Sequence, residues 1–184
     1  MSLPEFPVGF DQPILVLAAC HRSIEEHIKA LNRLQKSLVR RGLGEEVRAA
    51  VRGIIKFFLE VVPIHHADEE LELFPRMLRA AEAMSDRASA FDLSSHLMVE
   101  HRDIEEVWER VHQNLLDLLS GEANDLDMPL CREFSRRYCD HIRREEELLF
   151  PLAARLLSDS DWRSLGTAMA LRRGLPAPSF PHAA

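Results

Sequence analysis

Four long segments of this sequence place an apolar residue at every third or fourth position. That spacing puts the apolar side chains on one face of an α-helix and leaves its other faces polar. The stripes run through residues 14–38, 47–77, 97–118 and 130–152, and helices of this length extend about 40 Å. Four such helices with short connections predict an all-α fold, an antiparallel up-down-up-down four-helix bundle.

Turn-forming residues separate the four stripes. Glycine and small polar residues gather at 41–44, 84–86 and 120–124, where we expect the chain to reverse. Beyond the stripes, Asp159 to Arg172 is expected to form a short helix that packs back on the bundle, and residues 174–184 form a proline-rich tail. We therefore divide the chain into a bundle, residues 1–157, and a C-terminal extension, residues 158–184.

Charge and composition narrow the class of protein. The net charge of -7 repels phosphate groups, so we expect no nucleic-acid partner. No run approaches the roughly 18 apolar residues that span a bilayer, and the first ten residues lack the pattern of a signal peptide. Three cysteines without a CxxC pair suit a reducing compartment. These features predict a cytoplasmic protein that does not bind membranes, and they leave the oligomeric state open.

One histidine interrupts each apolar stripe, and two stripes add a glutamate four residues later. These residues are His21, His65, Glu69, His101, His141 and Glu145. In an antiparallel hairpin, two residues at the same height are equidistant from the turn between them. The midpoints of successive histidines fall at residues 43, 83 and 121, each in or beside an expected turn. The sequence therefore predicts four histidines in one layer of the core, with both glutamates one helical turn away.

A buried layer of this composition indicates a metal site. Unpaired buried carboxylates cost several kcal/mol each, and crowded imidazoles would leave their ring nitrogens without partners. Two cations would remove this cost, with each glutamate bridging them and the histidines binding at the ends. Nitrogen and carboxylate ligands without thiolate favour iron, manganese or zinc. Six protein ligands leave open positions on two octahedral ions, as in a reactive rather than a structural site.

The motifs His65-x-x-x-Glu69 and His141-x-x-x-Glu145, each followed by Leu-Phe-Pro, alternate with His21 and His101. In this pattern the chain resembles the hemerythrin-like, or HHE cation-binding, domain over about residues 11–157. The resemblance implies a non-haem di-iron centre in the bundle core, bridged by oxygen, hydroxide or water. It also implies roles in binding or sensing dioxygen, nitric oxide, peroxide or iron.

One position departs from the oxygen-carrying members of that family. Their third helix has a His-x-x-x-His pattern, whereas Leu97 stands four residues before His101 here. The resemblance therefore favours sensing or handling of peroxide and nitric oxide over reversible oxygen storage, and turnover stays an open question. The alternatives are a metal-gated protein-interaction or iron-sensing module, with the C-terminal extension as its output, and a metal-free helical scaffold.

Several neighbours of the expected layer have two interpretations. His66 lies beside the stripe and either binds metal or hydrogen-bonds a ligand. Tyr138 stands one turn before His141, where it acts on the centre through a hydrogen bond or redox chemistry, or is an ordinary core aromatic. We expect Cys20 to be a buried, inert thiol, and Glu70 and Glu146 to be surface charges.

The remaining candidates define the surroundings of the layer. We expect Phe58, Trp108 and Phe134 to wall the pocket and control which small molecules enter. Glu105 is assigned to a solvated face. His96 lies on a different face from His101 and suits a surface or channel role.

Overall fold

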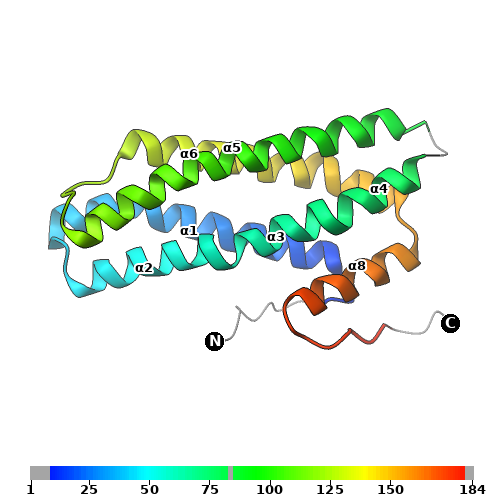
Figure 1. Cartoon of the computed structure of the whole chain (residues 1–184), viewed down its shortest axis with the longest axis horizontal. Coiled ribbons are helices and arrows are strands. Elements are labelled where there is room, and N and C mark those ends of the chain that lie inside the picture. Colours follow the sequence, from blue (N-terminus) through cyan, green and yellow to red (C-terminus); the bar gives the residue numbers. More distant parts are fainter. Residues whose placement is uncertain (1–8, 83–84, 181–184) are drawn as a thin grey trace.

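A computed structural model of the chain describes residues 9–82 and 85–180. Its described residues form helices and no strands, in four long rods that run alternately up and down (Figure 1). The first rod is α1 (Pro13–Arg41) and the third is α5 (Arg87–Ser120). The predicted all-α fold and its antiparallel bundle architecture are confirmed.

The second and fourth rods are composite, which the apolar pattern does not show. The second consists of α2 (Glu45–Glu60), α3 (Val62–Asp68), the π-helical turn η1 (Glu69–Leu73) and α4 (Phe74–Ala81). The fourth consists of α6 (Met128–Arg144), the π-helical turn η2 (Glu145–Leu149) and α7 (Phe150–Leu156). Each π-helical turn thus begins at the glutamate of a His-x-x-x-Glu motif.

A proline follows each π-helical turn within two residues. In η1 the backbone N–H of Phe74 bonds the carbonyl of Glu69, five residues earlier. Pro75 and Pro151 each lie in the first turn of the next helix. Because proline lacks an N–H and its ring clashes with the carbonyl four residues earlier, a widened turn accommodates it at lower cost. The rods therefore continue through these prolines instead of ending there.

The connections occur where the sequence predicts reversals. Gly42 ends α1 and Gly121 ends α5, both with positive φ, which glycine adopts without the strain of a side chain. Met84, in the expected middle turn, lies outside the described residues.

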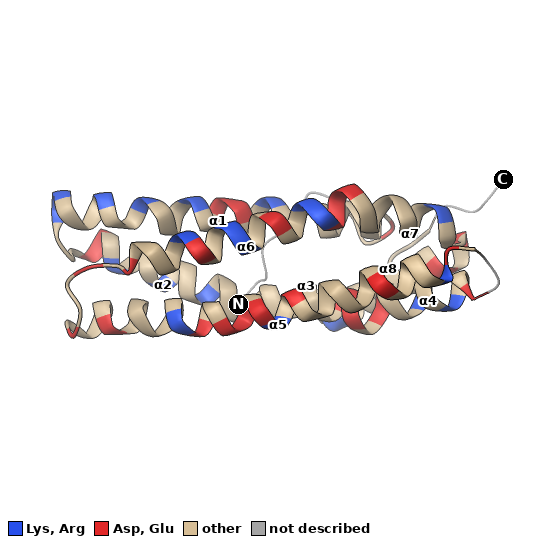
Figure 2. Ribbon diagram, turned by 90° about the horizontal axis from the view of Figure 1, so that it is seen from above, with Lys and Arg blue, Asp and Glu red and all other residues tan. Residues whose placement is uncertain are grey.

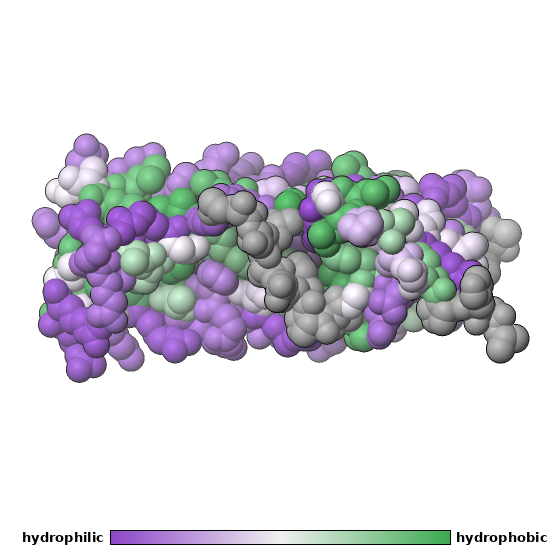
Figure 3. Space-filling model, turned by 90° about the horizontal axis from the view of Figure 1, so that it is seen from below, coloured by the Kyte–Doolittle hydropathy of each residue, from purple (hydrophilic) through white to green (hydrophobic). Residues whose placement is uncertain are grey.

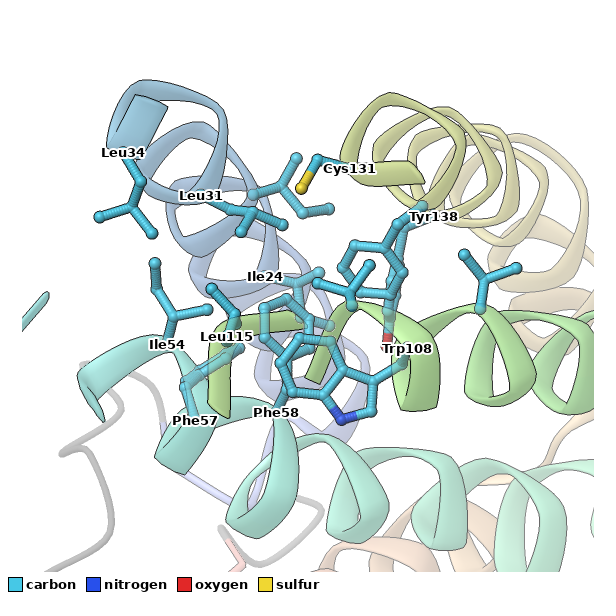
Figure 4. Packing of buried hydrophobic residues seen from close by; sticks show 14 of the residues in the cluster. Ile24, Leu31, Leu34, Ile54, Phe57, Phe58, Trp108, Leu115, Cys131 and Tyr138 are labelled. Atoms are coloured by element: carbon cyan, nitrogen blue, oxygen red, sulfur yellow. The ribbon is translucent and has the colours of Figure 1, made fainter. Parts of the chain in front are cut away.

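The polar layer divides the apolar core into two clusters. One cluster lies toward the turns at Gly42 and Gly121 and contains Ile24, Phe58 and Leu115 (Figure 4). The other contains Leu17 and Leu97 and extends to α7. On α1, His21 lies between Leu17 and Ile24, so the histidine layer is enclosed by apolar side chains at both ends.

The C-terminal helix α8 (Asp159–Arg172) has the bounds that the sequence predicts, and it packs against α1, α3 and η1 (Figure 1). Gly166 lets α8 approach the segment just before α1 closely, because a Cβ at Gly166 would lie 1.9 Å from the carbonyl oxygen of Phe10. The guanidinium groups of Arg172 and Arg173 pair with the buried carboxylate of Asp68 at 2.5 and 2.7 Å. Beyond α8, residues 175–180 have no regular secondary structure, and residues 181–184 of the tail lie outside the described part.

Acidic and basic residues are spread along the length of the rods (Figure 2). The face seen in Figure 3 mixes hydrophilic and hydrophobic side chains. Among the described residues, no helix has both the length and the apolar character needed to cross a membrane. The division into a bundle and an extension at residue 157 stays a prediction.

Candidate metal centre

All six residues that the sequence singles out lie in one buried layer. Each of the four rods contributes one histidine, and the second and fourth rods add the glutamates at the first residues of η1 and η2. No side chain among the six is more than 1% exposed; they are His21, His65, Glu69, His101, His141 and Glu145. The layer that the sequence predicts is therefore present.

The donor atoms of this layer form two groups. His21, His65, Glu69 and Glu145 each offer a nitrogen or oxygen within 4.8 Å of the others. A second group consists of His66, His101 and His141, at the same spacing. Two neighbouring groups of buried donors suit two metal ions better than one, and the second group depends on His101 and His141, because His66 has contacts of a different kind.

Both glutamates reach between the two groups. One oxygen of Glu145 lies 3.0 Å from Nε2 of His21, and its other oxygen lies 3.1 Å from Nε2 of His141. Glu69 likewise places Oε1 3.6 Å from Nε2 of His65 and Oε2 3.5 Å from Nε2 of His101. Each carboxylate thus presents one oxygen to each side, which is the arrangement of a bridging ligand.

Many polar atoms of the layer have no hydrogen-bond partner in the described part of the chain. They include both oxygens of Glu69, both oxygens of Glu145, both ring nitrogens of His65 and Nε2 of His21. Buried polar groups are normally paired, since each unpaired one costs about 1–3 kcal/mol. Binding a cation would engage these atoms, so the layer fits a metal site by its unsatisfied donors as well as by its composition.

Carboxylates outside the layer orient three of the histidines. The Nδ1–H of His21 donates to Glu146 at 3.0 Å, and the Nδ1–H of His101 donates to Glu70 at 2.6 Å. The Nδ1–H of His141 donates to a further carboxylate, Glu100, at 3.0 Å. Such bonds fix the tautomer and leave the Nε2 lone pair directed inward, as at metal-binding histidines generally.

The inward nitrogens would repel one another without a cation. Nε2 of His101 and Nε2 of His141 lie 3.0 Å apart, and both rings already donate their Nδ1–H outward. Two neutral rings would therefore direct lone pairs at each other. A shared proton or a metal ion is needed to make this contact favourable.

The metal-free layer has strongly shifted proton affinities. Burial raises the pKa of Glu69 well above its ordinary value, and the nearby carboxylate of Glu145 adds to the rise. Burial alone would also raise the pKa of Glu145, but His141 holds it well below the ordinary value. Burial lowers the pKa of His65 well below its usual range. Burial alone would lower the pKa of His141, but the carboxylates of Glu145 and Glu100 raise it to about 9.

The metal-free protein is therefore expected to lose stability as the pH rises from 6.5 to 9. A group whose pKa is raised by folding stabilises the fold below its unfolded value and loses that contribution as the pH passes its folded value. His141 is such a group, because its pKa is raised from 6.5 to about 9. Glu69 is another, because its pKa is also raised by folding. Urea unfolding in the presence of a chelator measures the effect. An unfolding free energy that is constant or increases over this range would contradict the assignment.

His66 has contacts of a different kind from the other histidines. Its ring stacks on that of His101, with centroids 3.9 Å apart and planes 11° from parallel. An ion lies close to the plane of the imidazole that binds it, so two stacked parallel rings are poorly placed to share one ion. Nε2 of His66 is also hydrogen-bonded to the hydroxyl of Tyr138 at 3.0 Å. This geometry favours the hydrogen-bonding role for both residues.

Sequence reasoning missed the outer carboxylates. Glu70 and Glu146 were expected to be surface charges, and their side chains are indeed 31% and 46% exposed, but their carboxylates accept bonds from the layer. Each directly follows a glutamate of the layer, which is the signal that could have found them. Glu100 directly precedes His101 yet contacts His141 on another rod, so no local pattern identifies it.

Three further residues lie around the layer. Cys20 is buried, and burial raises the pKa of its thiol, which suits an inert group. His96 is exposed and lies 3.3 Å from Glu100. Glu105, assigned to a solvated face, is exposed but lies 3.6 Å from Nδ1 of His66.

Comparison with known proteins gives an independent result. Residues 12–153 match the model of the hemerythrin HHE cation-binding domain. An uncharacterized protein of Haemophilus influenzae is 30% identical over 170 residues, which cover 92% of this chain and 95% of that protein. The matched residues span α1 to α7 almost completely and contain the whole buried layer.

Proposed function

This chain belongs to the hemerythrin HHE cation-binding domain family, and we propose that its buried layer holds two iron ions which bind, sense or detoxify dioxygen, nitric oxide or peroxide. Manganese and zinc are the alternative metals. The proposed ligands are His21, His65, Glu69, His101, His141 and Glu145.

The two glutamates carry this proposal. Because Glu69 and Glu145 each present one oxygen to either side of the layer, they are placed to bridge two ions. When bound, a pair of iron ions supplies small-ligand binding and one-electron redox chemistry. Six protein ligands leave coordination positions for such a ligand.

Residues around the layer orient its histidines and limit its contact with water. Glu70, Glu100 and Glu146 keep three imidazoles in the tautomer that directs Nε2 inward. The apolar clusters on both sides limit water, so electrostatic attraction between ligands and ions is screened less than at a surface.

Anaerobic loading with iron(II) tests the proposal. We expect about two iron ions per chain and a near-ultraviolet charge-transfer band that changes on exposure to air, nitric oxide or hydrogen peroxide. His65→Ala should lose metal, whereas His27→Ala should retain it, because His27 donates to the carbonyl of Ser23 outside the layer. Retention of full metal content by His65→Ala would refute the ligand set, and an unchanged spectrum would refute ligand binding.

One observation favours the second candidate, a metal-gated interaction module. Asp68, which immediately precedes Glu69, is fully buried and pairs with Arg172 and Arg173 at the end of α8. A change at the centre could thereby alter how α8 is held. Limited proteolysis around α8 that depends on bound metal, without any turnover of peroxide or nitric oxide, would support this alternative.

A further inference from the structure

A pocket opens beside the metal centre between the second rod and α5 and α6. It has a volume of about 360 Å³ and opens to solvent. Its wall contains Phe58, Trp108 and Phe134 but none of the six proposed metal ligands, so the expectation that these aromatic residues wall the metal site itself stays a prediction. Figure 4 shows Phe58 and Trp108 together with Tyr138. The rings of Phe58 and Trp108 are 4.5 Å apart.

The size of this pocket exceeds what a diatomic molecule needs. A dry cavity of roughly 150 Å³ already accepts benzene. The walls are mainly aromatic and aliphatic, with Val62 and Ile104 beside the three rings. Its volume and lining therefore suit a molecule that carries at least one ring or a branched chain.

The inner part of the pocket contains a polar atom that makes no hydrogen bond within the described residues. This atom is Nδ1 of His66, a residue that lines the pocket and is 5% exposed. A carboxylate oxygen of Glu105 lies 3.6 Å from it, within ion-pair distance but too far for a direct hydrogen bond. A hydroxyl group on an occupant could bond both, because its O–H donates to the carboxylate while its oxygen accepts from the Nδ1–H of the ring.

The rim of the pocket is acidic. Glu105 and Glu109 lie at its exposed edge, and the described residues that line the pocket include no lysine or arginine. Negative charge at the entrance disfavours a carboxylate or phosphate ligand. A cation would lose its hydration among the aromatic and aliphatic walls. We therefore expect an uncharged occupant.

We propose that this pocket binds a small uncharged molecule with an apolar ring or branched body and one hydroxyl-type group, the class of alcohols and organic hydroperoxides. The stacking of His66 on His101 places such an occupant one imidazole ring away from the centre. The role of this occupant as a substrate rests on the proposed function, whereas its binding to the pocket does not.

Fluorine NMR on the zinc-loaded protein tests the binding without redox chemistry. The probes are 4-fluorobenzyl alcohol, 4-fluorotoluene, which lacks the hydroxyl, and 4-fluorobenzoate, which is charged. We expect saturable line broadening with the alcohol, binding about three- to tenfold weaker for the toluene, and none for the benzoate. Equal binding of the alcohol and the toluene would overturn the hydroxyl assignment, and binding of the benzoate alone would overturn the proposal.

Matched variants locate the binding. Val62→Phe adds a ring inside the pocket and should weaken alcohol binding about tenfold or more. Val99→Phe makes the same change at an exposed position that does not line the pocket, and it should bind as the wild type does. If Val62→Phe does not fold, Leu59→Trp covers the half-exposed rim instead. Equal affinity in the blocking and control variants would refute this location.

Zinc content separates this inference from the proposed function. Protein that retains its metal but binds no alcohol would refute the pocket and leave the metal centre intact. Protein that binds the alcohol but holds no metal would refute the proposed metal centre and leave the pocket proposal intact.

Discussion

Removing the ions from the iron-loaded protein is expected to lower its melting temperature by about 10 °C or more. Metal that binds only the folded chain at a concentration 1,000 times its dissociation constant stabilises it by about 4 kcal/mol. In a protein of this size, each kcal/mol corresponds to about 2–4 °C. The unpaired oxygens of Glu69 then contribute their desolvation cost instead of binding cations.

Calorimetry before and after treatment with a chelator measures this change, and returning the metal should restore the original melting temperature. The His65→Ala variant is the control, because a chain that has lost metal should melt at the same temperature with or without chelator. An unchanged melting temperature in the wild-type protein would exclude a buried metal centre.

Glu69→Gln is expected to have opposite effects in the two states of the protein. In the loaded protein it removes one bridging oxygen, so metal content should fall to one ion per chain or fewer, with a loss of stability comparable to chelation. In the metal-free protein it should raise stability on the order of 1 kcal/mol. The reason is that burial, followed by the charge of Glu145, raises the pKa of Glu69, so folding must overcome the cost of its carboxyl group.

Glu147→Gln is the matched control for this substitution. Glu147 belongs to η2 as Glu69 belongs to η1, but its side chain is exposed. We expect unchanged metal content by elemental analysis and an unchanged melting temperature in both states. Destabilisation of the metal-free protein by Glu69→Gln would show that the carboxyl group stabilises the fold by itself.

Periodicity in the sequence was sufficient to predict the four rods and the height of the histidine layer along the bundle. Apolar spacing identifies the inward face of each helix, and the distance of a residue from the next turn sets its height. His21, His65, His101 and His141 therefore could be placed in one layer before any contact was known. The helix α8 was also predicted from the sequence, over Asp159 to Arg172.

Tertiary structure alone decided the orientation of each side chain. A shift of one residue turns a helix by about 100°, and the π-helical turns at Glu69 and Glu145 add a local change that apolar spacing does not reveal. Hence Glu145 lies inside the layer while Glu146 bonds His21 from outside. Contacts between rods, such as Glu100 with His141, depend on how separate helices rotate against each other. The sequence thus determined which six residues share the layer, and packing determined which of their atoms face its interior.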